Sequence, residues 1–167
     1  MTVGVGTPTR SCQDRRMSTT HRFIEASPHD VFDVLSDGWL FPSWVVGSAR
    51  IREVDLTWPS VEATIHHSFG VWPLVIDDVT TILEWDPPVR AVFHAKGWPM
   101  GEARVEIDVR NRMGGCFVTM TEYAVAGPGR LVPKPLMDPP LHWRNKEALQ
   151  RLAWLAEGRV KDRVSPS

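Results

Sequence analysis

Apolar and polar residues alternate with a period of two through most of the chain. From Ala49 onward, Gly, Pro and Asp residues divide this region into segments of strand length. Asp86-Pro87-Pro88 and Met113-Gly114-Gly115 are typical links between antiparallel neighbours. With an earlier segment over Thr19–Ala26, the predicted strands are Ala49–Thr57, Val61–Phe69, Leu74–Trp85, Val89–Trp98, Glu102–Arg112 and Cys116–Val125. The pattern therefore predicts an antiparallel meander of about seven strands.

Three helices are predicted outside this alternating region. Residues 27–30 form a helix start, with Ser27 as N-cap and Asp30 as the acid of a capping box. Trp39–Trp44 predicts a second short helical turn, broken at Pro42. After a proline-rich loop, apolar residues recur at three- and four-residue steps from about Leu141 to Arg159. This last helix is the largest element available to cover the sheet, so an α+β fold is predicted in which it lies across a curved sheet.

The strands share one apolar face. Glu102–Arg110 alternates most cleanly, with charged residues on one face and apolar residues on the other. The same register places His66 and His94 on the outer face. It places the following residues on the inner face: Val61, Ala63, Ile65, His67, Phe69, Ala91, Phe93, Ala95, Ala103, Val105, Ile107, Val109, Cys116, Val118, Met120 and Glu122. A shift of one residue would reverse each assignment.

The domain organisation is simple. Residues 1–17 lack periodicity and are expected to be a disordered lead, residues 18–159 to form one domain, and residues 160–167 to be a polar tail. Met17 is an alternative to Met1 as the start of translation. At 167 residues, 43% hydrophobic and 23% charged, the chain has the composition of one ordinary globular domain.

Composition and charge exclude several kinds of partner. A net charge of -1 without a basic run gives no reason to expect nucleic acid. No apolar run approaches the roughly 20 residues of a membrane span, so integral membrane contact is not expected. Two cysteines, Cys12 in the lead and Cys116 in a predicted strand, favour a reducing compartment and hence a cytoplasmic location.

Several local sequences together resemble one known superfamily. They are the strand before Ser27-Pro28, the helix with Val31-Phe32, Met120-Thr121-Glu122-Tyr123, Gly127-Pro128, and Arg144 to Leu149 opening the last helix. They are similar to the START-like (SRPBCC) superfamily, in its polyketide cyclase/dehydrase and lipid-transport branch, over roughly Thr19 to Gly158. The resemblance implies a helix-grip fold, in which the sheet wraps the C-terminal helix and encloses a ligand cavity. Members include lipid carriers, cyclases and co-chaperones, so the fold leaves the function open.

The implied cavity would be lined from the inner strand face, two apolar loops and the last helix. The expected lining residues are Trp44, Ile65, His67, Phe69, Trp72, Phe93, Val105, Ile107, Val118, Met120, Leu136, Ala148 and Leu152. The loops over Phe69–Leu74 and Pro128–Pro140 form either a portal for a hydrophobic ligand or a cap on the core. The eight tryptophans suit core and cavity wall alike, because each indole joins a large apolar area to one donor.

Motifs for metal, nucleotide and serine-hydrolase chemistry are missing from the sequence. His66 and His67 are neighbours in a predicted strand and point to opposite faces, so they cannot both bind one metal ion. We therefore expect no metal site and no cofactor.

Four polar residues remain as candidates for an interior role. His67 is expected inside, as a general base or as a hydrogen-bonded part of the wall. Asp77 and Asp78 lie in mid-strand, and we expect a bulge that lets both reach water; the alternative is an inward acid or polar anchor at Asp78. Glu122 is expected to face inward, and Arg144 and Arg151 are its possible partners; we predict a pair with Arg144 that fixes the helix to the sheet. His67, Asp78 and Glu122 are the catalytic candidates.

Three functions fit these observations. The first is non-catalytic binding of a hydrophobic small molecule, a lipid or a polyketide-like compound, between the sheet and the last helix. The second is an enzyme of the aromatase/cyclase type that uses acid and base groups in the cavity. The third is an interaction module like the co-chaperone members, which needs an exposed apolar patch. The identity of the ligand, and whether the protein is a monomer or a homodimer, are left open.

Overall fold

A computed structural model describes residues 17–71, 74–97, 101–127 and 134–164 of the chain. The helices are α1 (Pro28–Leu35), the 3-10 turn η2 (Gly38–Leu40), α2 (Phe41–Trp44) and α3 (Lys134–Val164). The strands are β1 (Met17–Ile24), β2 (Ser48–Val54), β3 (Thr64–Val71), β4 (Leu74–Asp86), β5 (Arg90–Gly97), β6 (Gly101–Arg112) and β7 (Gly115–Ala126). The predicted elements are therefore present in the predicted order, and residues 1–16 of the predicted lead lie outside the described residues.

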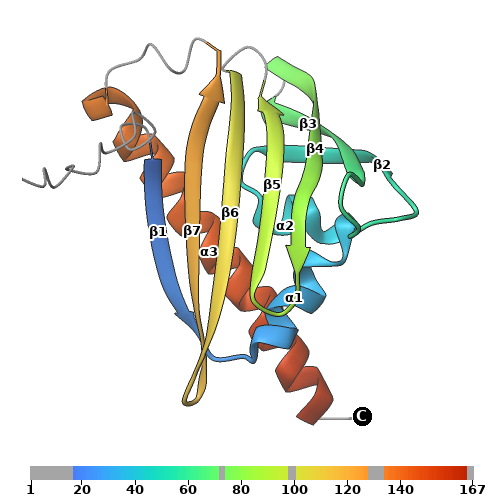
Figure 1. The fold of residues 1–167 in the computed structure, drawn as a ribbon, viewed down its shortest axis with the longest axis vertical. Coiled ribbons are helices and arrows are strands. Elements are labelled where there is room, and N and C mark those ends of the chain that lie inside the picture. Colours follow the sequence, from blue (N-terminus) through green and yellow to red (C-terminus); the bar gives the residue numbers. More distant parts are fainter. Residues whose placement is uncertain (1–16, 72–73, 98–100, 128–133, 165–167) are drawn as a thin grey trace, which may run out of the picture.

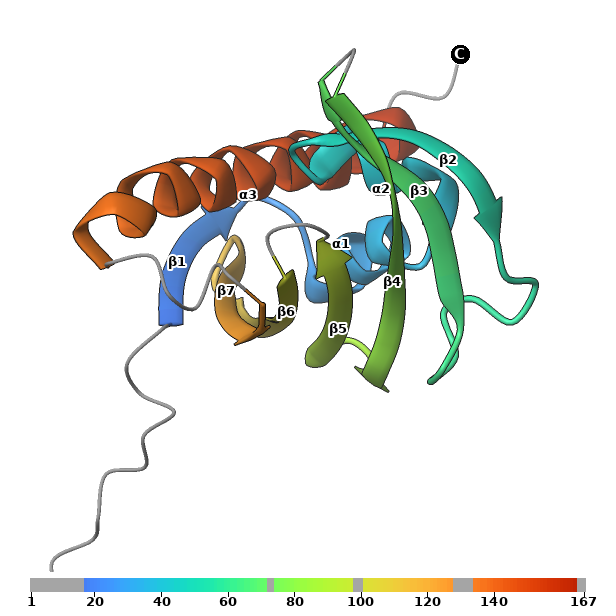
Figure 2. The same ribbon diagram turned by 90° about the horizontal axis from the view of Figure 1, so that it is seen from above.

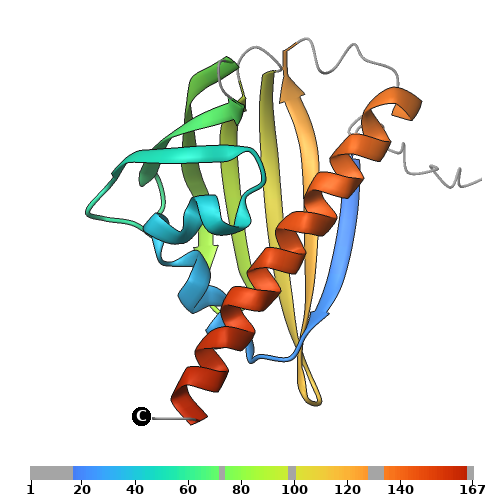
Figure 3. The same ribbon diagram turned by 180° about the vertical axis from the view of Figure 1, so that it is seen from behind.

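The strands form one antiparallel sheet in the order β1-β7-β6-β5-β4-β3-β2. The sheet curves strongly, and α3 runs diagonally across its inner side (Figure 2, Figure 3). α3 makes its main contacts with β1, β7, α1 and α2. The helix-grip α+β fold predicted from the sequence is confirmed.

α1 begins where the sequence predicts. The Ser27 hydroxyl accepts a hydrogen bond from the Asp30 backbone N–H (3.3 Å), and the Asp30 carboxylate accepts one from the Ser27 N–H (2.9 Å). This reciprocal pair is a capping box, which satisfies backbone donors that the first helical turn leaves free. Pro42 does not break the second helical turn as predicted. It lies in the first turn of α2, where its missing N–H costs nothing.

α3 is longer than predicted at both ends. It begins at Lys134, inside the expected proline-rich loop, so Pro135 lies in the first turn, where proline is tolerated. Pro139 and Pro140 follow in the next turn, where each removes one backbone hydrogen-bond donor. At the other end α3 continues past Arg159 to Val164. Arg163 supports this last turn because its guanidinium binds the carboxylate of Asp30 in α1.

The core lies between the inner sheet face and the helices. Its fully buried side chains include Ile24, Val31, Ile65, Ile82, Ile107, Val118, Leu149 and Leu152. One predicted inner residue is wrong: Val61 is 53% exposed, because β3 begins only at Thr64 and Val61 belongs to the preceding turn. Phe69, Ala95 and Ala103 face inward as predicted but are only partly buried.

We predict that Ser27→Ala lowers the free energy of unfolding by about 1 kcal/mol, because the N-cap hydroxyl is lost. Urea unfolding followed by circular dichroism measures the change. Ser60→Ala, at an exposed loop position, is the matched control and should change stability by less than about 0.5 kcal/mol. Equal effects of the two substitutions would contradict the role assigned to the cap.

Candidate functional site

The inner face of the sheet carries a row of small side chains. Strand register sets Ala95 of β5 opposite Ala103 of β6, and Ala103 opposite Ala124 of β7. All three side chains, here called the alanine row, are partly exposed. One step closer to α1 Phe93 is 3% exposed and lies opposite the partly buried Val105, and one step further Ile107 is fully buried. The inner face is therefore packed at the α1 end and less covered at the alanine row.

A polar cluster stands at the β4 end of this row. Thr80 of β4 lies opposite Ala95, and Asp78 of the same strand lies opposite His67 of β3. His67 Nε2 is 3.0 Å from Thr80 Oγ1 and 3.8 Å from Asp78 Oδ2. His67 is 2% exposed, Asp78 5% and Thr80 1%, so the whole cluster is removed from water.

Burial opposes charge on both ionisable members of this polar cluster. Desolvation lowers the pKa of His67 to about 4, a shift that the nearby Ser68 backbone partly offsets and that the positive charge of Arg52 increases. Desolvation raises the pKa of Asp78 to about 6, against backbone hydrogen bonds from Val79 and Lys96. The 3.8 Å contact is thus not an ion pair at neutral pH, because His67 with a pKa of about 4 is unprotonated there.

One ring nitrogen of His67 makes no hydrogen bond of good geometry, although the Ser68 backbone lies near enough to the ring to raise its pKa. Nδ1 is buried, and no protein atom within the described residues meets hydrogen-bond geometry with it. A buried polar atom without a partner costs free energy. The hydrogen-bonding capacity of this atom is therefore unused within the described residues.

A series of aromatic contacts begins at the polar cluster with Phe41 and continues to Trp44, whose ring lies 5.5 Å from that of Phe41. The Phe41 ring lies 5.0 Å from the His67 ring, and the Phe93 ring lies 6.5 Å from Trp44 and 6.2 Å from Trp58. The Trp58 indole N–H donates to the Leu35 carbonyl (3.3 Å), which fixes this ring against α1. The polar groups thus lie in an aromatic wall, an arrangement typical of sites for hydrophobic molecules.

The bulge expected at Asp77 and Asp78 is absent, and that prediction is wrong. The pairing of β3 with β4 is regular here, with Ser68 opposite Asp77 and His67 opposite Asp78. A regular strand sends neighbouring side chains to opposite faces. Asp77 is exposed and pairs with Arg52 (3.0 Å), whereas Asp78 turns inward, which is the alternative that the sequence left open.

The structure brings Glu122 and Arg144 together, the pair expected from the sequence. Glu122 lies on the inner face of β7 at 7% exposure, and the Arg144 guanidinium of α3 donates to its carboxylate. The neighbouring Asn145 is 2% exposed and belongs to the inward stripe of α3 with Ala148, Leu149 and Leu152. The Asn145 Nδ2 group is buried and without a partner among the described residues.

The residues expected to line a cavity fall into three groups. Trp72 and the side chain of Leu136 lie outside the described residues. Phe69 and Val105 face inward and are partly buried. The others are buried: Trp44, Ile65, His67, Phe93, Ile107, Val118, Met120, Ala148 and Leu152.

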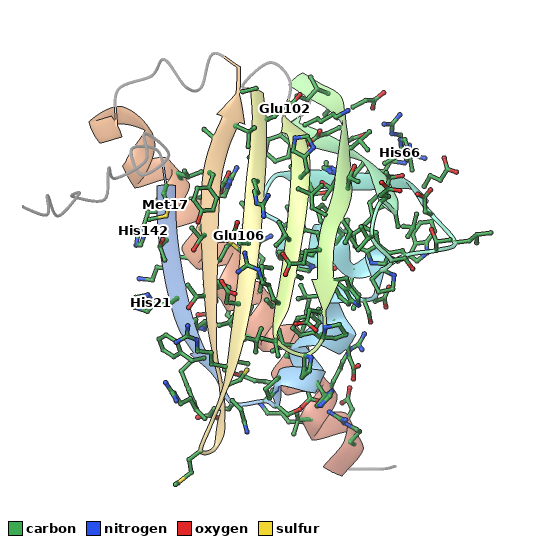
Figure 4. All side chains as sticks on the ribbon, viewed as in Figure 1. Met17, His21, His66, Glu102, Glu106 and His142 are labelled. Carbon is green, nitrogen blue, oxygen red and sulfur yellow. The ribbon has the colours of Figure 1, made fainter. Side chains whose placement is uncertain are left out.

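The outer face of the sheet carries a separate charged network. Figure 4 shows Glu102 and Glu106 on the side of β6 that is turned away from α3. Arg90 donates to Asp108 (2.7 Å) and Glu106 (2.8 Å), and His94 contacts Glu102 (3.0 Å). His66 and His142 lie at opposite sides of the molecule (Figure 4). Among the described residues, no three His, Cys, Asp or Glu side chains gather as a metal site would require.

Comparison with known proteins gives the class to which this fold and inner face belong. The chain belongs to the polyketide cyclase/dehydrase and lipid transport family, whose sequence profile matches residues 16–157. A comparison with functionally characterised proteins yields no significant match.

Of the helices in the described part of the chain, none has the length and apolarity needed to span a membrane.

Solved structures share the fold at low sequence identity. SA2116 of Staphylococcus aureus, a protein of unknown function, aligns with a TM-score of 0.70 at 10% identity over 89% of this chain and 97% of its own. NE0264 of Nitrosomonas europaea gives 0.69 at 15% identity, over 87% and 97% of the two chains. DynU16, a protein in the dynemicin biosynthetic locus, gives 0.64 at 17% identity, over 86% of this chain and 48% of DynU16. These similarities establish the fold.

Sequence reasoning missed two contributors to the site. Thr80 was not singled out, because a threonine in a strand is ordinary and only its register with His67 gives it a role. Asn145 lies within the predicted last helix, but the sequence analysis did not identify it as a polar group of the interior. The sequence signal that could have identified it is a polar amide, Asn145, on the same helix face as Ala148, Leu149 and Leu152.

We predict that Arg144→Leu lowers the free energy of unfolding by about 2 kcal/mol, because it leaves the buried Glu122 carboxylate without a cation. The loss is below that of a fully buried pair, since Arg144 is 33% exposed and water screens it. The Glu122→Leu/Arg144→Leu double variant should recover much of the loss. Arg151→Leu, in the partly exposed pair with Glu147, is the control and should cost less than about 0.5 kcal/mol. Denaturant unfolding of all four proteins measures these differences.

We also predict opposite pH responses from the two ionisable members of the polar cluster. The pKa of His67 falls from its ordinary 6.5 to about 4 on folding, so its contribution to stability is lost as pH falls through this range. The pKa of Asp78 rises from 3.8 to about 6, so its contribution is lost as pH rises from 3.8 through 6. Asp78→Asn should therefore make stability fall more steeply on acidification from pH 6.5 to 4 than in the unsubstituted protein. His67→Gln should make stability fall less steeply over the same pH range than in the unsubstituted protein, or rise.

Chemical unfolding at half-unit pH steps measures these slopes. Asp77→Asn, which removes the exposed neighbouring carboxylate, is the matched control and should keep the slope of the unsubstituted protein. Identical slopes in all four proteins would show that neither interior pKa is shifted.

Proposed function

We propose that the protein binds a hydrophobic small molecule, a lipid or a polyketide-like compound, between the inner sheet face and α3, without chemical change. The observation that carries this proposal is the His67, Asp78 and Thr80 cluster, buried in an aromatic wall with His67 Nδ1 unpartnered. Binding sites for such molecules join a predominantly apolar wall to a few polar groups that fix orientation. The family to which the chain belongs includes polyketide cyclases, dehydrases and lipid transport proteins, which supports a ligand of this kind.

The alanine row supplies the second support. Small side chains at Ala95, Ala103 and Ala124 leave more room above the sheet than Phe93 and Val105, the inward residues beside Ala95 and Ala103. The partial exposure of all three alanines agrees with a surface that other side chains do not fill. A ligand seated on the row would touch Thr80 at its β4 end.

A second candidate is catalysis of cyclisation and water loss on a polyketide-like substrate. The specific observation in its favour is the pairing of an imidazole whose pKa is lowered to about 4 with a carboxyl whose pKa is raised to about 6. At pH 7 the first is a neutral base, and the second keeps a fraction of its proton. Two such groups 3.8 Å apart suit removal of a proton from carbon and its delivery to a departing hydroxyl. Pure binding is the simpler function because it requires only one polar anchor.

We predict that the purified protein binds the neutral fluorophore N-phenyl-1-naphthylamine saturably, with one molecule per chain. Ala95→Phe should weaken this binding at least tenfold, because the added ring occupies the alanine row. Val75→Phe, on the outer face of β4, is the control and should leave binding unchanged. Fluorescence titration measures the affinity, and melting curves verify that both variants fold. Absence of saturable binding, or equal binding by both variants, would contradict the proposal.

One further measurement distinguishes binding from catalysis. If the protein only binds, a polyketide-like compound incubated with it is recovered unchanged by mass spectrometry. Loss of one water from the compound, abolished by His67→Gln, would favour the enzyme instead.

A further inference from the structure

Two polar groups with unused hydrogen-bonding capacity lie on elements that flank the alanine row, His67 on β3 and Asn145 on α3. His67 lies toward the β4 end, and its Nδ1 makes no hydrogen bond of good geometry. At the β7 end, Ala124 is two residues from Glu122 on the same inner face, and Glu122 is bound by Arg144 of α3. The next residue of α3, Asn145, carries the second unpartnered group.

Asn145 is not explained by the packing of the helix. Its side chain is 2% exposed and shares the inward stripe with Leu149 and Leu152, where an apolar residue would suit the core better. Its Oδ1 accepts from Arg144 Nε and Nη2, each at 3.4 Å, but its Nδ2 donates to no atom of the described residues. A buried amide donor with no acceptor costs free energy. An acceptor on a bound molecule would remove that cost.

The distance between the two ends follows from the sheet. Thr80 and Ala124 lie on β4 and β7, which are separated by β5 and β6. Three strand spacings of about 4.8 Å give about 14 Å along the row. That span suits a molecule of two or three linked rings, or an extended chain of about ten carbons.

We propose that the ligand is a neutral, elongated hydrophobe with an oxygen function at each end, lying across β4 to β7 on the alanine row. This inference rests on the proposed function. The Asn145 Nδ2 group takes an acceptor, such as a carbonyl or phenol oxygen. His67 Nδ1 takes a hydroxyl, which can donate or accept and so suits either tautomer of the ring.

Charge at the two ends disfavours an acidic ligand. Asp78 stands beside His67 at one end, and Glu122 stands beside Arg144 at the other. The Arg144 guanidinium is already bound to Glu122, and the Arg52 guanidinium is bound to Asp77. A carboxylate head would meet a protein carboxyl at either end, so fatty acids fit less well than diphenols or hydroxyketones.

Two matched stilbenes test the inference. trans-4,4′-Dihydroxystilbene carries a hydroxyl at both ends, and trans-4-hydroxystilbene carries one, while dodecanoic acid represents a single acidic head. We expect the dihydroxy compound to bind about tenfold more tightly than the monohydroxy compound, and dodecanoic acid to bind least tightly. Asn145→Leu should remove the preference between the two stilbenes. Calorimetric titration at pH 7 measures all affinities.

Asn145→Leu also separates a ligand contact from a structural role. If Asn145 serves the ligand, replacing its unpartnered amide by an apolar side chain of similar size leaves the melting temperature unchanged or raises it. A lowered melting temperature with an intact stilbene preference would overturn the inference. Gln150→Leu, at a partly exposed position of the same helix, is the control and should keep the preference.

The remaining outcomes distinguish this inference from the function on which it rests. Equal affinity for the two stilbenes, or tighter binding of dodecanoic acid, would overturn the two-ended ligand while leaving hydrophobic binding intact. Failure of all three compounds and of N-phenyl-1-naphthylamine to bind would overturn both.

Discussion

One long helix packs on the inner face of a seven-stranded sheet, but the helix is narrower than the sheet and leaves part of that face uncovered. Seven strands at about 4.8 Å spacing span about 29 Å, whereas a helix with its side chains is about 10 Å wide. α3 lies mainly over β1 and β7, and α1 and α2 pack beside it. The curvature of the sheet reduces the mismatch without removing it. The partly exposed alanine row lies on this same inner face.

Two ion pairs, one in each half of α3, fix the helix in addition to its apolar packing. Arg144 binds the inward Glu122 near the N-terminal half of the helix, and Arg163 binds Asp30 in the last turn. Asp30 also closes the capping box of α1, so one carboxylate fixes two helices at once. Because both carboxylates are buried, their partners determine where α3 lies on the sheet.

Desolvation determines the chemistry of the interior. It moves the pKa of His67 down to about 4 and that of Asp78 up to about 6, so at pH 7 His67 is neutral and Asp78 keeps a fraction of its proton. A neutral imidazole in an aromatic wall suits recognition of uncharged oxygen functions. The same two groups would be needed for acid and base catalysis, which is why binding and cyclisation are neighbouring functions on this fold.

The sequence by itself determined the elements and their faces. Period-two alternation located the strands, the Ser27 to Asp30 segment located α1, and the inward Glu122 required a cation on the last helix. The strands and the start of α1 follow from local sequence. The partner of Glu122 follows from the high free-energy cost of burying an unpaired carboxylate. The tertiary structure decided what depends on register between strands distant in sequence: that Asp78 rather than a bulge faces His67, and that three alanines align across β5, β6 and β7. It also decided that Asn145 keeps a free donor, because hydrogen-bond partners in the interior are set by three-dimensional packing and not by the order of residues.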